Sequence, residues 1–245
     1  MPGLTETESS RLCVVLVRTR NPLNVGAAAR AMTNFGFSDL RLVEVFAPSL
    51  EEARSAVGAA ELLKTARTFP SITEAVGDCK LVVGTTAGRN RELRQPIHDL
   101  PVFAPRIRQT LASGKVALLF GSEKTGLSNE ELSYCHELLR IPTTNANVSM
   151  NLGQAVAVCL YQLRVGEALA IAAAPDVDLP DGEQLERISH LLLEVLVESD
   201  FTQPHTHAAV EDKVRRLIRR MQLSSEDAEL WLGMLRQIRW RIRKS

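Results

Sequence analysis

The chain carries five short runs of mostly apolar residues, and polar loops separate them. Each run has four to six residues, which is typical of strands that are buried on both faces of a parallel sheet. We therefore predict strands over residues 12–17, 40–43, 80–84, 115–120 and 138–141.

Stretches with apolar residues at helical spacing follow most of these strands. We predict helices over residues 25–37, 49–65, 129–135 and 151–172. Asn24 and Gly36 stand where the first of them would be capped, and Ser128 with Glu131 forms a capping box for the third. Residues 1–10 are polar and are expected to be frayed. The alternation of strands and helices predicts an α/β fold with a mostly parallel sheet, whose ligands bind beyond the carboxyl ends of the strands.

Composition divides the chain into three parts. Residues 1–173 form the predicted body, and residues 174–183, rich in Asp and Pro, form a linker. Residues 184–245 contain three amphipathic stretches, which predict a helical C-terminal extension.

The formal net charge of zero conceals an uneven distribution of charge. Residues 211–245 carry ten Lys and Arg against five Asp and Glu. A basic tail on a mildly acidic body favours local contact with a polyanion, although a solvated helix face explains the same pattern. Hydrophobic residues make up 45% of the chain, which is enough for a full core.

Cysteine spacing and hydropathy exclude several classes of protein. The four cysteines are far apart and form no Cys-x-x-Cys pair, so we expect neither a disulfide framework nor a zinc site. His205 and His207 lack partner ligands, and we predict no metal site. The N-terminus does not resemble a signal peptide, and no apolar run approaches about 18 residues. We therefore expect a cytoplasmic protein without a membrane span.

The segment after the fourth strand has two glycines at the spacing of a phosphate-binding loop. Leu127, however, stands where that loop requires Lys, and no G-x-G-x-x-G follows the first strand. These departures argue against nucleoside triphosphatases and dinucleotide-binding enzymes. Gly121 and Gly126 still allow the backbone to approach a ligand closely, and its polar groups could read an adenine edge.

Several polar side chains stand in positions that packing alone does not require. Arg30 lies among Ala and Met on a predicted helix, either as a functional group or as an ordinary surface arginine. A loop after the third strand contains Arg89, Arg91 and Arg94, which suit phosphate contact or simply a solvated loop. Four short polar residues precede the last helix of the body, and helix capping explains only one of them: Asn145, Asn147, Ser149 and Asn151.

Three of these segments, in this order, resemble the three motifs of the SPOUT superfamily of RNA 2′-O-ribose methyltransferases. The segments are residues 21–36, 120–132 and 141–156, and the resemblance covers residues 11–172. The length and the tail are similar to those of TrmJ-type tRNA (cytidine/uridine-2′-O-)-methyltransferases.

The resemblance implies an α/β-knot fold with a deep C-terminal trefoil knot, and a homodimer whose sites lie at the interface. It implies that S-adenosyl-L-methionine (SAM) is the cofactor and that tRNA is the substrate, methylated at cytidine or uridine 32 of the anticodon loop. Methylation of rRNA by the same chemistry, or RNA binding without catalysis, are the alternatives. The cofactor residues implied are Thr85, Thr86, Ala87, Phe120, Gly121, Glu123, Gly126, Leu127, Ile141, Ser149, Met150, Asn151 and Leu152.

The resemblance also assigns roles in the reaction. Arg30, Asn24 and Ser149 would form the catalytic group, with Arg30 reaching SAM held largely by the other subunit. Because a guanidinium is a poor base, we expect Arg30 to hold the phosphate beside the reacting hydroxyl, and Asn151 to hold its loop. The RNA contacts expected are Arg89, Arg91, Arg94, Arg215, Arg216, Arg219 and Arg220.

Overall fold

The computed structural model describes residues 4–45, 60–87, 95–144, 149–165, 178–202 and 207–244. Its strands are β1 (Leu12–Val17), β2 (Asp39–Val43), β3 (Arg67–Phe69), β4 (Cys79–Thr85), β5 (Ile97–Asp99), β6 (Lys115–Phe120) and β7 (Glu137–Arg140). They form one sheet in the order β3-β2-β1-β6-β4-β7-β5, and every neighbouring pair is parallel. All five predicted strands are present.

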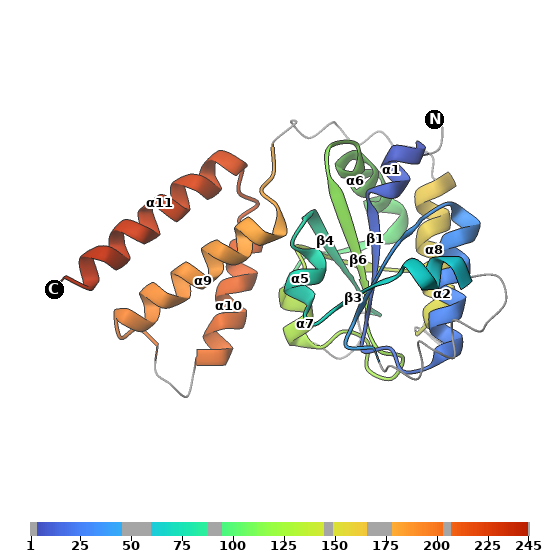
Figure 1. Ribbon diagram of the computed structural model, residues 1–245, viewed down its shortest axis with the longest axis horizontal. Coiled ribbons are helices and arrows are strands. Elements are labelled where there is room, and N and C mark those ends of the chain that lie inside the picture. The colour runs from blue at the N-terminus through green and yellow to red at the C-terminus, as the bar shows by residue number, and fades with distance from the viewer. Residues whose placement is uncertain are drawn as a thin grey trace.

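The helices are α1 (Glu6–Ser10), α2 (Pro22–Phe35), α4 (Ala60–Thr65), α5 (Ile72–Val76), α6 (Leu100–Ser113), α7 (Asn129–Ser133), α8 (Leu152–Val165), α9 (Gly182–Glu198), α10 (His207–Arg220) and α11 (Ser225–Ile242). Alternate residues of β1 enter different cores. Leu12, Val14 and Leu16 pack with α2, α6 and α8, whereas Cys13 and Val15 pack with α5 and α7. The sheet is thus covered on both faces (Figure 1), as the apolar runs predicted.

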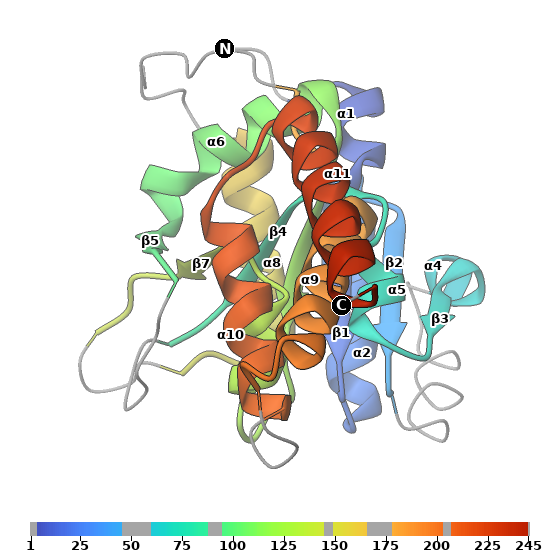
Figure 2. The same ribbon diagram turned by 90° about the vertical axis from the view of Figure 1, so that its left-hand side faces the viewer.

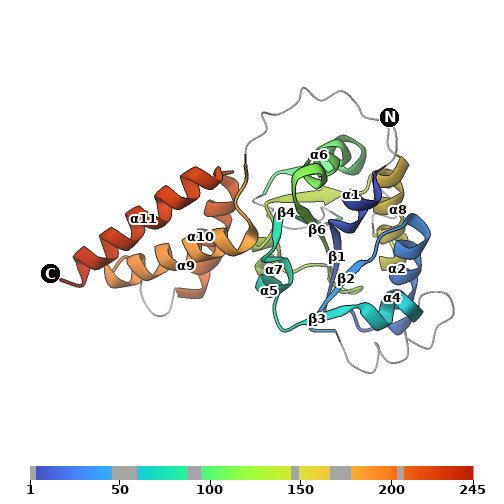
Figure 3. The same cartoon turned by 45° about the horizontal axis from the view of Figure 1, so that its top comes forward.

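The C-terminal helices form a third core beside the sheet. α9 packs against both α10 and α11, and its N-terminal part contacts α5 and β4. Figures 1 and 3 show these helices on the side of α5 and α7, away from α2 and α8, and in Figure 2 they face the viewer. α9 begins at Gly182, inside the stretch predicted as a linker. Of the helices in the described residues, none is long and apolar enough to cross a membrane.

The expectation of a frayed N-terminus is wrong for residues 4–10. Thr5 and Glu8 form a capping box that opens α1. Leu4 is buried, and the guanidinium of Arg164 on α8 donates to the Leu4 carbonyl and to the Ser9 hydroxyl. A local cap together with a tertiary anchor therefore orders a segment whose polar composition suggested otherwise.

The first long helix begins earlier than predicted. Asn21, and not Asn24, is its N-cap: the Asn21 side chain accepts a hydrogen bond from the Leu23 N–H, and Pro22 occupies the first helical position. Gly36 ends the helix with φ of 76°, as predicted. The earlier start places Asn24 inside the first turn, so that its side chain is available for contacts outside the helix.

Four further elements were not predicted from the sequence: β3, α5, β5 and α6. β5 has only three residues, and α6 contains Pro101 in its first turn and Pro105 inside it. Of the helix predicted over residues 49–65, the part after residue 59 is present as α4; the rest lies outside the described residues. α8 is described as far as Val165, short of the predicted residue 172.

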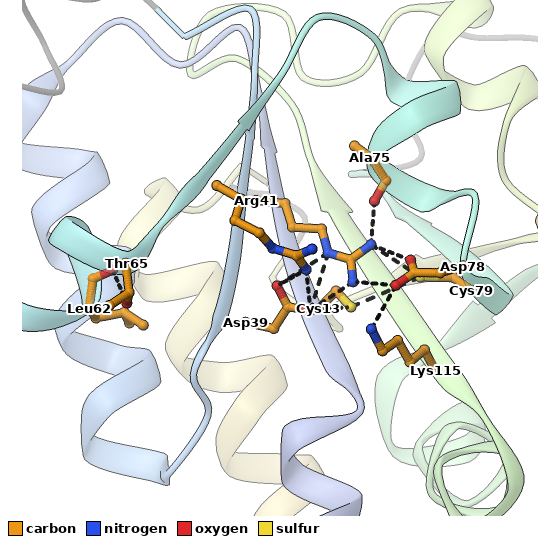
Figure 4. Close-up of polar contacts among 10 residues, drawn as sticks. Cys13, Asp39, Arg41, Leu62, Thr65, Ala75, Asp78, Cys79 and Lys115 are labelled. Carbon is orange, nitrogen blue, oxygen red and sulfur yellow. Dashed lines mark hydrogen bonds and ion pairs between the residues drawn. The ribbon is translucent and has the colours of Figure 1, made fainter.

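An ion cluster around the buried Arg41 joins β2 and β3 to β6 and to the start of β4. The Arg41 side chain is 1% exposed and lies 2.7 Å from Asp39 and 2.5 Å from Asp78 (Figure 4). Burial raises the pKa of Asp39, but hydrogen bonds from Arg41, Arg67 and the Cys13 thiol outweigh burial and bring this pKa to about 2.

Replacing Arg41 by Met should destabilise the fold by about 2–3 kcal/mol at pH 7, because two carboxylates lose their shared counter-charge. The loss stays below the upper range for buried pairs, since Arg67 and Lys115 still contact Asp39 and Asp78. A carboxylate with a lowered pKa stabilises the fold above its unfolded pKa and ceases to do so as the pH falls toward its folded pKa. Urea unfolding should therefore show a smaller difference between the two proteins at pH 3 than at pH 7; an equal difference would contradict the assignment.

Candidate functional site

A cavity of about 290 Å³ lies at the carboxyl ends of β4, β6 and β7. Three segments that are distant in sequence surround it, one after each of these strands. The lining residues are Thr85, Thr86, Ala87, Phe120, Gly121, Ser122, Glu123, Lys124, Thr125, Gly126, Leu127, Leu139, Ile141, Thr143, Ser149, Met150, Leu152 and Ala155. This is the edge at which open parallel sheets bind ligands.

The segment after β6 folds back on itself. Ser122 and Gly126 form an antiparallel bridge, and Gly126 has a positive φ of 65°. A Cβ on Gly121 would lie 2.2 Å from both the Gly126 carbonyl carbon and the Leu127 nitrogen. The two glycines therefore allow a turn in which backbone contacts backbone, as well as an approach to a ligand.

The end of this turn is fixed to the body of the protein. Leu127 is buried, and Ser128 with Glu131 forms the predicted capping box at the start of α7. The Arg18 guanidinium, at the end of β1, lies 2.6 Å from the Glu131 carboxylate. On the far side of the cavity, the Thr85 hydroxyl donates to the Leu119 carbonyl at 2.8 Å, which ties the segment after β4 to β6.

A chain of three polar side chains connects the remaining segments. Asn151 caps α8, because its Oδ1 accepts hydrogen bonds from the backbone N–H groups of Gly153 and Gln154. Its Nδ2 donates to Asn24 Oδ1 at 2.8 Å, and Asn24 Nδ2 donates to Glu123 Oε1 at 3.0 Å. Since Glu123 can only accept when ionised, this chain of donors fixes both amide orientations.

Glu123 receives more than one donor. Burial raises the pKa of Glu123, but hydrogen bonds from the Asn24 side chain and from backbone N–H groups, including those of Asn21 and Arg20, lower it by more. The pKa of Glu123 therefore lies below its usual value. Glu123 is therefore an ionised carboxylate at the rim of the cavity. Arg20 and Asn21, just before α2, and Asn24, in its first turn, hold it there.

Replacing Asn24 by Asp should destabilise the fold by about 1–3 kcal/mol at pH 7.5, because a donor to the Glu123 carboxylate becomes a second carboxylate. Repulsion raises the pKa of one of the two groups, so the lost stability should return in part as the pH falls to 5. Urea unfolding at both pH values measures this. Asn24→Ala is the control, since it removes the donor without adding charge and its cost should depend little on pH. Equal pH dependence of the two variants would contradict the proposed contact.

Twelve of the thirteen residues expected to bind the cofactor line the cavity. The exception is Asn151, which caps α8 and holds Asn24. The expectation missed six lining residues: Ser122, Lys124, Thr125, Leu139, Thr143 and Ala155. Ser122, Lys124 and Thr125 stand inside the turn between Gly121 and Gly126, and their place between the two glycines was the available signal.

The three expected catalytic residues lie at different places relative to the cavity. Ser149 lines the cavity, and Asn24 contacts its rim through Glu123. Arg30 is exposed on α2 and does not line the cavity of its own chain. Arg89, Arg91 and Arg94 lie outside the described residues.

Three of the four arginines predicted to bind RNA through the tail have another role, which corrects that expectation. Arg215 and Arg219 are buried, and both pair with Glu186 of α9. The Arg215 guanidinium also stacks 4.3 Å from the Tyr134 ring centroid. Arg216 donates to the Asn129 carbonyl of α7. These cations attach α10 to the body, because acidic and aromatic partners surround them; of the four, only Arg220 is exposed.

No group of three or more His, Cys, Asp and Glu that could hold a metal ion occurs in the described part of the chain. Among the described residues, the side chains that line the cavity carry hydroxyls, one carboxylate, one ammonium group and apolar groups.

The sheet order, the helices on both faces and the cavity define the SPOUT class of α/β folds, with a helical C-terminal extension. A crystal structure of TrmJ from Zymomonas mobilis ZM4 superposes with a TM-score of 0.79 at 29% identity, covering 92% of this chain and 98% of that one. The trefoil knot stays an implication of the resemblance, and residues 88–94 after β4 and 145–148 after β7 lie outside the described residues.

The chain belongs to the SpoU rRNA Methylase family, which matches residues 11–161. It is 34% identical over 230 residues to the tRNA (cytidine/uridine-2′-O-)-methyltransferase TrmJ of Sodalis glossinidius, covering 92% of this chain and 90% of that protein. It is 34% identical over 238 residues to the tRNA (cytidine/uridine/adenosine-2′-O-)-methyltransferase TrmJ of Pseudomonas aeruginosa, covering 92% of each.

Proposed function

We propose that this chain is a SAM-dependent tRNA 2′-O-ribose methyltransferase that modifies cytidine or uridine at position 32 of the anticodon loop, in the cytoplasm. The observation that carries the proposal is the meeting of three segments around one cavity, with Asn24 hydrogen-bonded between Glu123 and Asn151. The names of the relatives supply the substrate class, tRNA, and the ribose 2′-oxygen as acceptor.

The lining of the cavity fits SAM. Its volume is near the lower end of the range for small-molecule sites, about 300–1,000 Å³. Phe120, Leu139 and Leu152 supply apolar surface for an adenine ring. Backbone groups of the segments around the cavity can form hydrogen bonds with the edge of that ring. Gly121 leaves no room for a side chain in the turn. Bound SAM would supply an electrophilic methyl group on a sulfonium.

The residues of this chain would orient the acceptor ribose and its phosphate. Arg30 carries a planar guanidinium that matches a phosphate in two parallel hydrogen bonds. Holding that phosphate fixes the neighbouring 2′-hydroxyl in line with the methyl group, which is the main requirement of a displacement at carbon. Since the pKa of a guanidinium exceeds about 12, the hydroxyl proton passes to a phosphate oxygen or to water. Ser149, which lines the cavity, would contact the acceptor ribose.

An exposed apolar surface on α2 and α8 supports a homodimer. Leu23 of α2 is 75% exposed, and Tyr161 and Val165 of α8 are 53% and 57% exposed. Arg30 stands seven residues after Leu23, on the same side of α2. A second copy seated on this surface would cover the apolar side chains and bring Arg30 toward the partner's cavity.

Replacing Tyr161 by Asp should convert the dimer into monomers, since a charge would be buried at the interface. Sedimentation velocity measures the change in mass, and methyl transfer should fall with it. Leu230→Asp is the matched control, because Leu230 is 61% exposed on α11, on the other side of the sheet from α2 and α8 (Figure 1). A monomeric wild-type protein with full activity would contradict the shared site.

Labelled SAM and separate pools of tRNA and rRNA test the function itself. We expect label in tRNA alone, at the ribose of nucleotide 32. Label in rRNA alone would show instead that the protein methylates rRNA, the substrate in the name of the family. Calorimetry that detects no binding of SAM would leave only a non-catalytic RNA-binding protein.

A further inference from the structure

The C-terminal end of α11 is strongly cationic. Residues 236–244 contain five Lys and Arg and no acidic residue. Arg239 and Arg243 turn toward α9, where they pair with Glu194 and Glu198. Arg236, on α11, and Lys244, just after its C-terminal end, are exposed.

Trp240 lies between these two cations. Arg236 and Trp240 are spaced by four residues and share one face of α11. Lys244 lies in the turn just after the helix and reaches back to the Trp240 ring. The Trp240 side chain is 49% exposed, and the Lys244 Nζ lies 4.0 Å from the centroid of its ring. Gly233, two turns earlier on this face, has open space where a side chain would stand.

We propose that this face, Arg236–Trp240–Lys244, binds an unpaired nucleotide of the RNA substrate: the Trp240 ring stacks on the base, and the two cations contact the flanking phosphates. The proposal rests on the proposed function in that it takes RNA as the substrate. α11 is remote from the sheet (Figure 1), so the nucleotide bound here is not the one that is methylated.

The chemistry of the face matches RNA in both of its parts. Aromatic rings stack on bases of any sequence, and the cations beside them follow the backbone. The contact between Lys244 and the ring is an exposed cation–π interaction, which is weaker than base stacking. The lysine can therefore leave the ring for a phosphate when a base arrives. A second copy of this chain would bring like charges together, so self-association through this face is disfavoured.

The fluorescence of Trp240 provides a direct test. The chain has two tryptophans, and Trp231 packs against the core of the C-terminal helices. In a Trp231→Phe protein, an unmodified tRNA transcript should quench the remaining emission saturably, and single-stranded RNA should quench it more than a duplex does. In the matched Trp240→Phe protein, the emission of Trp231 should change little.

Kinetics provide an independent test. Trp240→Ala should raise the KM for tRNA by about 5- to 100-fold and leave kcat unchanged, whereas Trp240→Phe should stay close to wild type. Arg236→Gln should lower the slope of log affinity against log salt by about one.

An unquenched Trp240 together with an unchanged KM for Trp240→Ala would overturn the proposal. A change in mass on sedimentation of Trp240→Ala without RNA would overturn it in favour of a protein contact. If Trp240 is quenched by RNA but the wild-type protein methylates no tRNA, the proposed function fails and the stacking face stands.

Discussion

Replacing Arg30 by Ala should lower the rate of methyl transfer by about 100- to 1,000-fold, which is the loss typical of one electrostatic contact at a reacting centre. Binding of SAM should change by less than about twofold, because Arg30 does not line the cavity of its own chain and would hold the RNA phosphate rather than SAM in the partner's. Single-turnover transfer to a tRNA transcript and calorimetry with SAM measure the two effects separately. Arg30→Lys should recover only part of the rate, since an ammonium lacks the planar fork of a guanidinium. Full activity of Arg30→Ala would remove this residue from the mechanism.

Replacing Gly121 by Ala should weaken binding of SAM by about 100-fold, at the upper end of the cost of overpacking. The new methyl group would meet the backbone of Gly126 and Leu127 at 2.2 Å, and backbone cannot move aside as a flexible side chain does. Calorimetry with SAM checks this prediction.

Gly126→Asn is the matched control within the same turn. Gly126 has a positive φ but open space around its missing Cβ, and Asn tolerates that conformation. We expect less than about a fivefold change in binding of SAM for the control. Equal effects of the two substitutions would show that the close approach of backbone at Gly121 does not shape the site.

The two large effects can be combined in one experiment. If Arg30 serves the cavity of the partner subunit, a mixed dimer of Arg30→Ala and Gly121→Ala subunits contains one intact site. At a SAM concentration too low to fill the Gly121→Ala site, mixing the two impaired proteins should then restore activity. If Arg30 serves its own cavity, no intact site forms and the mixture stays inactive.

Much of the site was predictable because its chemistry is local in sequence. Each cavity segment directly follows an apolar run, and the carboxyl ends of parallel strands meet at one edge of the sheet. The Ser128 capping box and the Gly36 terminus are likewise local patterns. The sequence therefore indicated where the cavity would form and most of the residues that line it.

Other features depend on contacts between segments that are distant in sequence. Arg215 and Arg219 are cations in a basic tail, and only their burial against Glu186 and Tyr134 shows that they attach the helices to the body. The link from Glu123 through Asn24 to Asn151 spans more than a hundred residues. The sequence suggested polar groups at each position but not their partners.

A tRNA transcript in which a single atom is removed tests the proposed reaction most directly. Two transcripts, identical except that nucleotide 32 carries a ribose in one and a 2′-deoxyribose in the other, are incubated with the protein and labelled SAM. We predict that the ribose transcript accepts one methyl group and the deoxy transcript accepts none. Equal labelling of both transcripts, or of neither, would contradict methylation of the 2′-hydroxyl at this position.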